Sequence, residues 1–192
     1  MRHAANRLKA QAIILGIFVA LIWLLEIIDI VLFHQGMNAL GIWPRHAAGL
    51  WGILFMPFLH GGLGHVAANT VPFIILGWLV MLRSFNDFAA VTLLTMLLTG
   101  LGLWLFGAAR AVYIGSSGLI FGYFGFLLLR GYFERSPQSI GVALIVTLLY
   151  GGLLWGVLPQ QPGISWEAHL FGFLSGVLAA SLLSNRPRGA DR

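Results

Sequence analysis

The sequence contains few charged residues and no cysteine. Only 9% of its 192 residues are Asp, Glu, Lys or Arg, whereas an ordinary soluble domain carries about 25%. A water-soluble globule of this size could not cover its surface with so few charges. Without cysteine, a disulfide framework, a thiolate nucleophile and a cysteine metal site are excluded. The net charge is +5, but the basic residues form no face interleaved with aromatic residues, so we expect no nucleic-acid partner.

Long apolar runs make up most of the chain. Hydrophobic residues account for 59% of it, and a helix needs about 20 apolar residues to cross the hydrocarbon core of a bilayer. Six segments with short connections meet this need. We therefore predict an all-α polytopic membrane protein, a six-transmembrane-helix bundle in which residues 1–192 form a single membrane domain. The six segments are 11–33, 59–82, 88–106, 117–129, 140–158 and 168–184.

The longest break between these segments covers residues 34–58. It contains several glycines and two prolines, yet it stays rich in Trp, Leu and Phe. This composition predicts a structured first loop that lies at the membrane surface, in place of a flexible linker. Short cytoplasmic tails are expected at about 1–10 and 185–192.

Most basic residues fall on one side of the six-span topology. Nine of the eleven Lys and Arg residues lie before the first segment or after the second, fourth and sixth, which leaves Arg45 and Arg110 opposite. The positive-inside rule then places both termini in the cytoplasm. The first apolar run is too long for a signal peptide, and no small-x-small cleavage site follows it. With no transit peptide and no seventh span, we expect the plasma (inner) membrane of a prokaryote, with membrane lipid around the bundle.

Segment 117–129 is the shortest of the six. Its 13 residues extend over about 20 Å as a helix, which is less than the bilayer core of about 30 Å. We therefore expect a short fourth helix that starts inside the membrane, after a loop that carries Arg110 and dips inward. Non-helical backbone at that depth is tolerated only where protein surrounds it or water reaches it. A polar cavity, and with it a functional site, is expected there.

Four polar side chains are expected at the depth of this cavity. Ser117 begins the fourth segment, and His169 opens the sixth. His65 and Asn69 lie four residues apart on one face of the second. A serine hydroxyl becomes a nucleophile when a base accepts its proton, and histidine is the usual base because its pKa lies near neutrality. Since His65, Asn69 and the Ser117 backbone N–H can stabilise an oxyanion, the pattern predicts acyl transfer.

Glycines spaced four residues apart predict how the fourth and sixth segments meet. Gly118 and Gly122 lie on the fourth segment, and Gly172 and Gly176 lie on the sixth. Each pair is a small-xxx-small motif, which lets membrane helices approach closely. Such packing would bring Ser117 beside the start of the sixth segment without intervening bulk.

Three motifs, in this order along the chain, resemble those of the rhomboid family of intramembrane serine proteases. The motifs are His60-x4-His65-x3-Asn69, Gly115-x-Ser117-Gly118 and Ala168-His169-x-x-Gly172. The resemblance covers essentially the whole six-helix core. It implies that Ser117 is the nucleophile and His169 the general base of a dyad without a third carboxylate.

The same resemblance implies roles for the neighbouring residues. His65 and Asn69 would line the oxyanion hole, and His60 would play a supporting part at the start of the second segment. Phe121 stands where the family commonly has a Tyr stacked on the catalytic histidine, so the stacking ring is kept and the hydroxyl is lost. The implied reaction, which uses no cofactor, is hydrolysis of peptide bonds in or near transmembrane segments. Its substrates would be single-pass membrane proteins with small residues at the scissile bond and a locally unstable helix.

Three alternatives stand beside this hypothesis. One is a zinc site made by His60, His65 and His169, but a five-residue spacing and the lack of His-Glu-x-x-His argue for no metal. The second is a non-catalytic rhomboid-like protein that binds transmembrane segments in membrane-protein quality control. The third is a small transporter, since Glu26 and Asp29 in the first segment are costly if they face lipid. These two carboxylates either mark an ion or proton path or bond to the adjacent loop.

Overall fold

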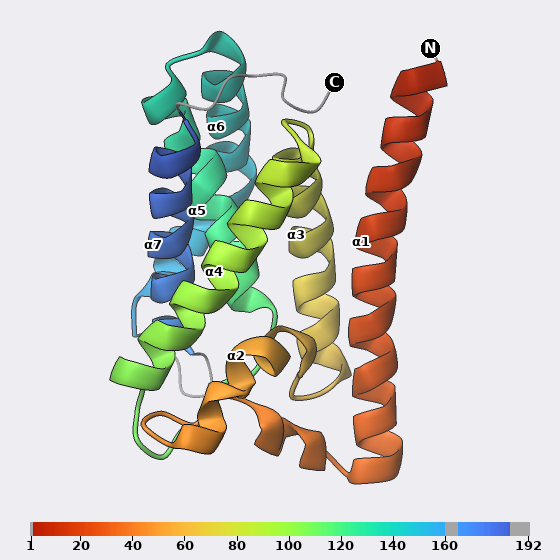
Figure 1. Cartoon of the computed structure of the whole chain (residues 1–192), viewed down its shortest axis with the longest axis vertical. Helices are drawn as coiled ribbons and strands as arrows, with labels where there is room; N and C mark the ends of the chain where they lie inside the picture. Colours follow the sequence, from red (N-terminus) through yellow and green to blue (C-terminus); the bar gives the residue numbers. More distant parts are fainter. Residues whose placement is uncertain (1, 160–164, 185–192) are drawn as a thin grey trace.

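The computed structural model describes residues 2–159 and 165–184, which form helices and helical turns and contain no strand. Long helices run up and down the bundle, with the start of α1 and the end of α7 at one end (Figure 1). The starts of α3, α5 and α7 lie at the opposite end, beside α2. The elements are α1 (Arg2–Ile28), a π-helical turn (Asp29–Phe33), α2 (Gly52–Phe55), α3 (Leu63–Met81), α4 (Phe85–Phe106), α5 (Ser117–Glu134), α6 (Pro137–Tyr150), a 3-10 helix (Gly151–Val157) and α7 (Trp166–Leu183).

Five helical segments of the described chain are long and apolar enough to cross a membrane, which identifies a multi-pass membrane protein. They are His3–Phe33, Leu63–Met81, Phe85–Phe106, Pro137–Val157 and Trp166–Leu183. The predicted all-α class is therefore confirmed. Residues 2–10, which were expected as a short tail, form the first part of α1. The expected tail 185–192, with its three arginines, lies outside the described residues.

The helix α5 does not belong to these five segments. It begins at Ser117, as predicted, but it ends at Glu134, so the predicted end at residue 129 is wrong. Its 18 residues extend over about 27 Å. Arg130 and Glu134 end the apolar run in the sequence, yet Arg130 Nε lies 2.9 Å from Glu134 Oε1 one turn along the same helix. Because this pair is buried within the protein, the helix continues through it.

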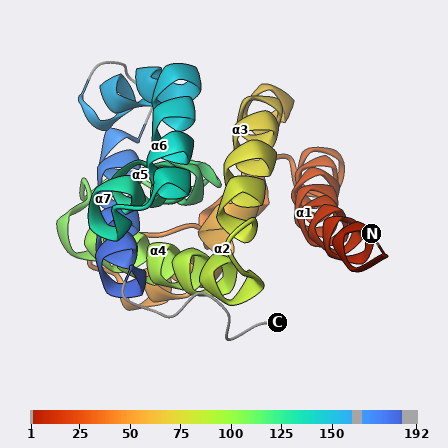
Figure 2. The same ribbon diagram turned by 90° about the horizontal axis from the view of Figure 1, so that it is seen from above.

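The bundle is organised around α5, which packs against α3, α4, α6 and α7 (Figure 2). A helix enclosed by other helices need not be apolar toward lipid, which explains why hydropathy alone does not identify it as a span. Its glycines meet α7 at backbone distance. A Cβ atom on Gly172 would overlap the carbonyl oxygen of Gly118, and one on Gly176 would overlap that of Gly122.

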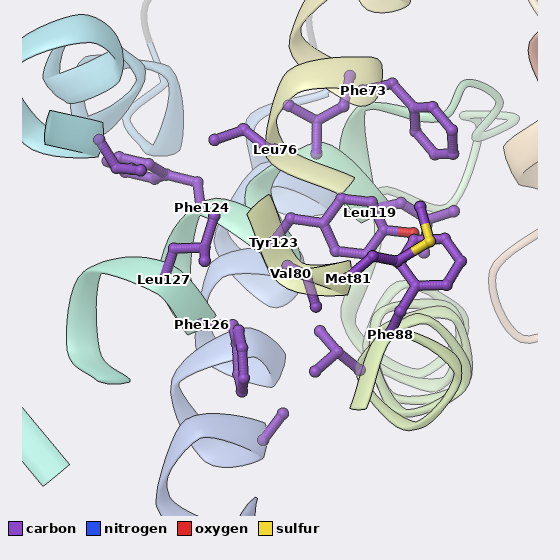
Figure 3. Packing of buried hydrophobic residues seen from close by; sticks show 14 of the residues in the cluster. Phe73, Leu76, Val80, Met81, Phe88, Leu119, Tyr123, Phe124, Phe126 and Leu127 are labelled. Carbon is purple, nitrogen blue, oxygen red and sulfur yellow. The ribbon is translucent and has the colours of Figure 1, made fainter. Parts of the chain in front are cut away.

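The largest cluster of buried apolar side chains lies between α3, α4, α5 and α7 (Figure 3). Phe73 and Leu76 of α3 and Phe88 of α4 surround Tyr123 of α5, which is fully buried. The Tyr123 hydroxyl lies 2.8 Å from the hydroxyl of Thr92, so its polar end is satisfied. This cluster holds α5 in place below its first turn.

The segment between α1 and α3 is structured, as its composition predicts. Three short 3-10 turns and α2 fill it. It is also tied to the segment between α4 and α5, since the backbones of Ile42 and Tyr113 exchange two hydrogen bonds of 3.0 Å. Arg45 adds a further link by donating to the carbonyl oxygens of Leu105 and Gly107 at the end of α4. The two loops therefore form one continuous layer at the end of the bundle where α5 begins.

Candidate active site

The turn before α3 fixes the orientation of His65. Gly62 adopts a φ of +115° and precedes the first residue of the helix. The backbone N–H of Gly61 donates to Nδ1 of His65 at 3.3 Å. Because a neutral imidazole has one N–H, an accepting Nδ1 places the proton on Nε2. His65 is therefore a hydrogen-bond donor through Nε2.

Gly115 brings this donor close to the start of α5. Its φ is +111°, and a Cβ atom at this position would lie 3.0 Å from both Cε1 and Nε2 of His65. The same Cβ atom would lie 3.9 Å from the Ser117 hydroxyl oxygen. A side chain at position 115 would thus occupy the space between the imidazole and the serine, and glycine leaves that space open.

His60 holds Ser116, the residue between Gly115 and Ser117. Its ring is fully buried, and its Nε2 accepts the backbone N–H of Ser116 at 3.3 Å and lies 3.2 Å from the Ser116 hydroxyl. Burial, with a smaller contribution from neighbouring His65, lowers the pKa of His60 to about 4. His60 is consequently neutral near pH 7 and can keep accepting from the Ser116 backbone.

His169 lies in the first turn of α7 and points its Nδ1 at the carbonyl oxygen of Gly156, 2.9 Å away. A carbonyl can only accept, so Nδ1 carries the proton and Nε2 keeps a lone pair. The ring also stacks on Phe121 of α5, with centroids 4.0 Å apart and an interplanar angle of 6°. The ring of His169 is therefore held in both tautomer and orientation.

The nucleophile candidate and this histidine lie on facing surfaces of α5 and α7. Ser117 and Phe121 are one turn apart on the same face of α5. A Cβ atom on Gly118 would lie 3.7 Å from the carbonyl oxygen of Ala168, the residue before His169. The two chains thus approach at the residues adjacent to the predicted dyad. No hydrogen bond joins Ser117 to His169 within the described part of the chain.

Asn69 lies one turn after His65 on α3 and keeps an unused donor. Its side-chain nitrogen is buried and has no hydrogen-bond partner among the described residues. It lines a small pocket between α1 and α3, together with Ser116 and apolar side chains that include Val66 and Phe73. The structure therefore gathers Ser117, His65 and Asn69 near the start of α5, with His60 behind them.

Gly156 was not predicted as a site residue. It lies in the 3-10 helix that follows α6, and a Cβ atom there would lie 2.8 Å from Phe121 Cζ and 3.4 Å from His169 Nδ1. In the sequence it is one glycine within an apolar run, and its partner residues are distant along the chain. No local pattern could have indicated its contact with the histidine.

The described residues do not support a metal centre. No group of three or more His, Cys, Asp or Glu side chains within them could hold a metal ion. In each of His60, His65 and His169, one ring nitrogen is engaged by a backbone group.

Glu26 and Asp29 are buried at the end of the first helical segment, and both bond to the adjacent loop. Glu26 accepts from the side chain of Gln35, and Asp29 accepts from the backbone N–H of Met37.

Comparison with known proteins identifies the family. The sequence model of the Rhomboid domain matches residues 47–186. An uncharacterized protein of Mycobacterium tuberculosis is 42% identical, over 90% of this chain and 75% of its own length. A second uncharacterized protein, from Mycobacterium leprae, is 41% identical over 87% and 69%. RHOMBOID-like protein 4 of Arabidopsis thaliana is 33% identical over 71% of this chain and 35% of its own length. The chain belongs to the rhomboid family.

Proposed function

We propose that the protein is an intramembrane serine endopeptidase that hydrolyses peptide bonds in or near transmembrane segments of membrane proteins. The observation that carries this proposal is the hydrogen bond between Nδ1 of His169 and the carbonyl oxygen of Gly156. It leaves Nε2 unprotonated, which is the form that a general base needs. Stacking on Phe121, which lies one turn from Ser117 on α5, fixes the plane of the imidazole ring.

The chemistry follows from the tautomers of His65 and His169 and from the start of α5. The Ser117 hydroxyl oxygen attacks the substrate carbonyl while Nε2 of His169 takes its proton. The resulting oxyanion receives hydrogen bonds from the Ser117 backbone N–H, Nε2–H of His65 and the side-chain amide of Asn69. His169 then donates its proton to the leaving amine. A water molecule, activated by the same nitrogen, hydrolyses the acyl-enzyme and restores Ser117.

The helix α5 supports this reaction through its first residue. The N–H groups in the first turn of a helix have no partner within the helix, and the helix dipole favours negative charge there. Ser117 is the first residue of α5. An oxyanion formed on its substrate is therefore close to the positive end of the helix, in a site built from α3, α5 and α7.

The proposal includes the topology in which this site works. Residues 1–192 form one membrane domain with six spans, and α5 is the fourth, starting below the membrane surface. Both termini are cytoplasmic, and the site lies in the outer half of a prokaryotic plasma membrane. The mycobacterial relatives support a prokaryotic setting. The resemblance to rhomboid proteases supports single-pass membrane proteins as substrates. Their helix is locally unstable, because a bond must leave its helix before Ser117 can reach it.

Cleavage of a reporter substrate in proteoliposomes tests the function. We expect wild type to cleave at least one of several single-span reporters, and Ser117→Ala and His169→Ala to abolish cleavage. Ser175→Ala is the matched control, since Ser175 is a buried serine of α7 that bonds to the carbonyl of Phe171 two turns from the site. The proposal fails if Ser117→Ala cleaves as well as wild type. Binding of reporters without cleavage by wild type would favour the non-catalytic alternative.

A further inference from the structure

Glu26 is a buried carboxylate that the reaction scheme does not use. It lies near the end of α1, and only 1% of its surface is exposed. It precedes residues 47–186, the part of the chain that matches the Rhomboid domain. Burying a carboxylate is costly unless hydrogen bonds satisfy it. Its Oε1 accepts two: one from the side-chain amide of Gln35 at 3.0 Å and one from the backbone N–H of Gly62 at 2.7 Å.

The second of these bonds reaches the turn that carries the site histidines. Gly62 lies two residues after His60 and three before His65, and its carbonyl oxygen accepts from the backbone N–H groups of His65 and Val66. The neighbouring Gly61 donates to Nδ1 of His65. The carboxylate of Glu26 therefore holds Gly62 in a two-glycine turn, and the backbone N–H of the preceding residue, Gly61, selects the tautomer of His65.

We propose that Glu26 is a positioning residue that fixes the His60–Gly62 turn and thereby keeps His65 protonated on Nε2, the donor that faces the oxyanion. The inference rests on the proposed function of the site. A two-glycine turn has more conformational freedom than any other dipeptide, and Gly62 adopts a left-handed φ of +115°. A charged acceptor is a strong restraint on such a turn. Glu26 thus couples α1, the first loop and the turn before α3 at one point.

Asp29 provides a matched control. It lies three residues after Glu26, at the start of the π-helical turn that follows α1, is 2% exposed, and also accepts a backbone N–H, from Met37 at 2.8 Å. Its bond stays within the first loop and does not reach α3. Loss of a buried carboxylate from the end of α1 is therefore common to variants of Glu26 and Asp29. Loss of the bond to Gly62 belongs to Glu26 alone.

The direct test is the protonation of His65, read from imidazole ¹⁵N NMR spectra of the full-length protein in detergent micelles. The His65 signals are assigned by comparison with His65→Gln. We expect Nε2–H in wild type and in Asp29→Leu, and a mixture of both tautomers in Glu26→Leu. Leucine keeps most of the volume and is tolerated in a membrane helix. Wild-type His65 protonated on Nδ1, or an unchanged tautomer in folded Glu26→Leu, overturns the proposal.

Reporter cleavage supplies the second readout. We expect kcat of Glu26→Leu to fall by about tenfold or more with KM nearly unchanged, because one oxyanion donor is misplaced. Glu26→Gln retains an acceptor oxygen and should recover kcat to within about threefold of wild type. An equal loss of kcat in Asp29→Leu would overturn the proposal. If the tautomer changes as expected but no reporter is cleaved by wild type, the protease function fails and the positioning role stands.

A further measurement covers the case in which Glu26→Leu does not fold. Glu26→Gln replaces a charged acceptor with a weaker neutral one, so the Gly62 amide should exchange with solvent about tenfold faster than in wild type. Asp29→Asn should leave that exchange rate unchanged. Equal Gly62 exchange rates in wild type and Glu26→Gln would overturn the proposal.

Discussion

The aromatic ring of Phe121 lies parallel to the imidazole of His169, with centroids 4.0 Å apart. The contact joins α5 to α7 one turn below Ser117, so it orients the proposed base without any hydroxyl group. We predict that Phe121→Tyr keeps kcat/KM for a reporter within about tenfold of wild type, because the stacking ring is retained. Phe121→Ala should lower it by about tenfold or more, since the imidazole loses its support. Complete inactivity of a folded Phe121→Tyr would show that stacking is not what matters.

Gly156 is the other restraint on His169, and it makes a second prediction. Alanine at this position would place a Cβ atom 2.8 Å from Phe121 and 3.4 Å from the Nδ1 of His169 that Gly156 binds. Gly156→Ala should therefore reduce reporter cleavage by about tenfold or more, because a small displacement of a catalytic group is costly. Gly152 lies in the same 3-10 helix with nothing within 4 Å of an added Cβ atom, so Gly152→Ala serves as control. Equal activities of the two folded variants would contradict the prediction.

The residues of the candidate site also show which features can be predicted from the sequence. Ser117 and His169 can be predicted because each sits in a short motif with glycines at helical spacing. Gly156 cannot, since it acts through one backbone contact with a histidine in another helix. Glu26 is noticed in the sequence as a costly carboxylate with a possible bond to the adjacent loop, but its contact with Gly62 cannot be predicted, because the two residues are distant along the chain. The end of α5 at Glu134 was missed for a related reason. A hydropathy scale penalises the charges of Arg130 and Glu134 and so ends the predicted segment before them. In the structure the two side chains pair with each other, and the helix continues inside the protein.

The close approach of α5 and α7 predicts a stability difference between glycines. A Cβ atom on Gly176 would overlap the carbonyl oxygen of Gly122 on the facing helix. We expect Gly176→Ala to lower the free energy of unfolding by about 1–3 kcal/mol, since the helices must separate to accept a methyl group. Gly141 of α6 has open space around an added Cβ atom, and there alanine should be neutral or stabilising. Unfolding in mixed micelles, followed by circular dichroism, measures both. A smaller loss for Gly176→Ala than for Gly141→Ala would be inconsistent with this packing.

A buried charge network lies at the end of the bundle opposite the candidate active site. We predict that breaking it lowers the free energy of unfolding by more than Gly176→Ala does. Arg83 Nε lies 2.7 Å from Asp87 Oδ2, and its Nη1 pairs with Glu134, which also binds Arg130. Removing one partner of a buried pair leaves an uncompensated charge, which costs about 3–5 kcal/mol. Glu134→Ala should show a loss of this size in the same unfolding assay. Arg135→Gln, at the exposed neighbouring position, should change stability by less than about 0.5 kcal/mol. Similar losses in the two variants would argue against the network.

His60 predicts how stability depends on pH. Its pKa in the folded protein is about 4, below the ordinary 6.5. Between pH 4 and 6.5 the unfolded chain therefore binds a proton at His60 and the folded protein does not. Well above pH 6.5, both states are neutral and His60 contributes no pH dependence. As the pH falls from 6.5 toward 4, His60 should destabilise the fold by at most about 1.4 kcal/mol per pH unit, and the effect should level off below pH 4. His60→Gln cannot titrate, so its unfolding free energy should vary less steeply over this interval. The comparison uses slopes, which makes it independent of any fixed cost of the substitution. Identical slopes in wild type and His60→Gln would show that the buried imidazole is not the titrating group.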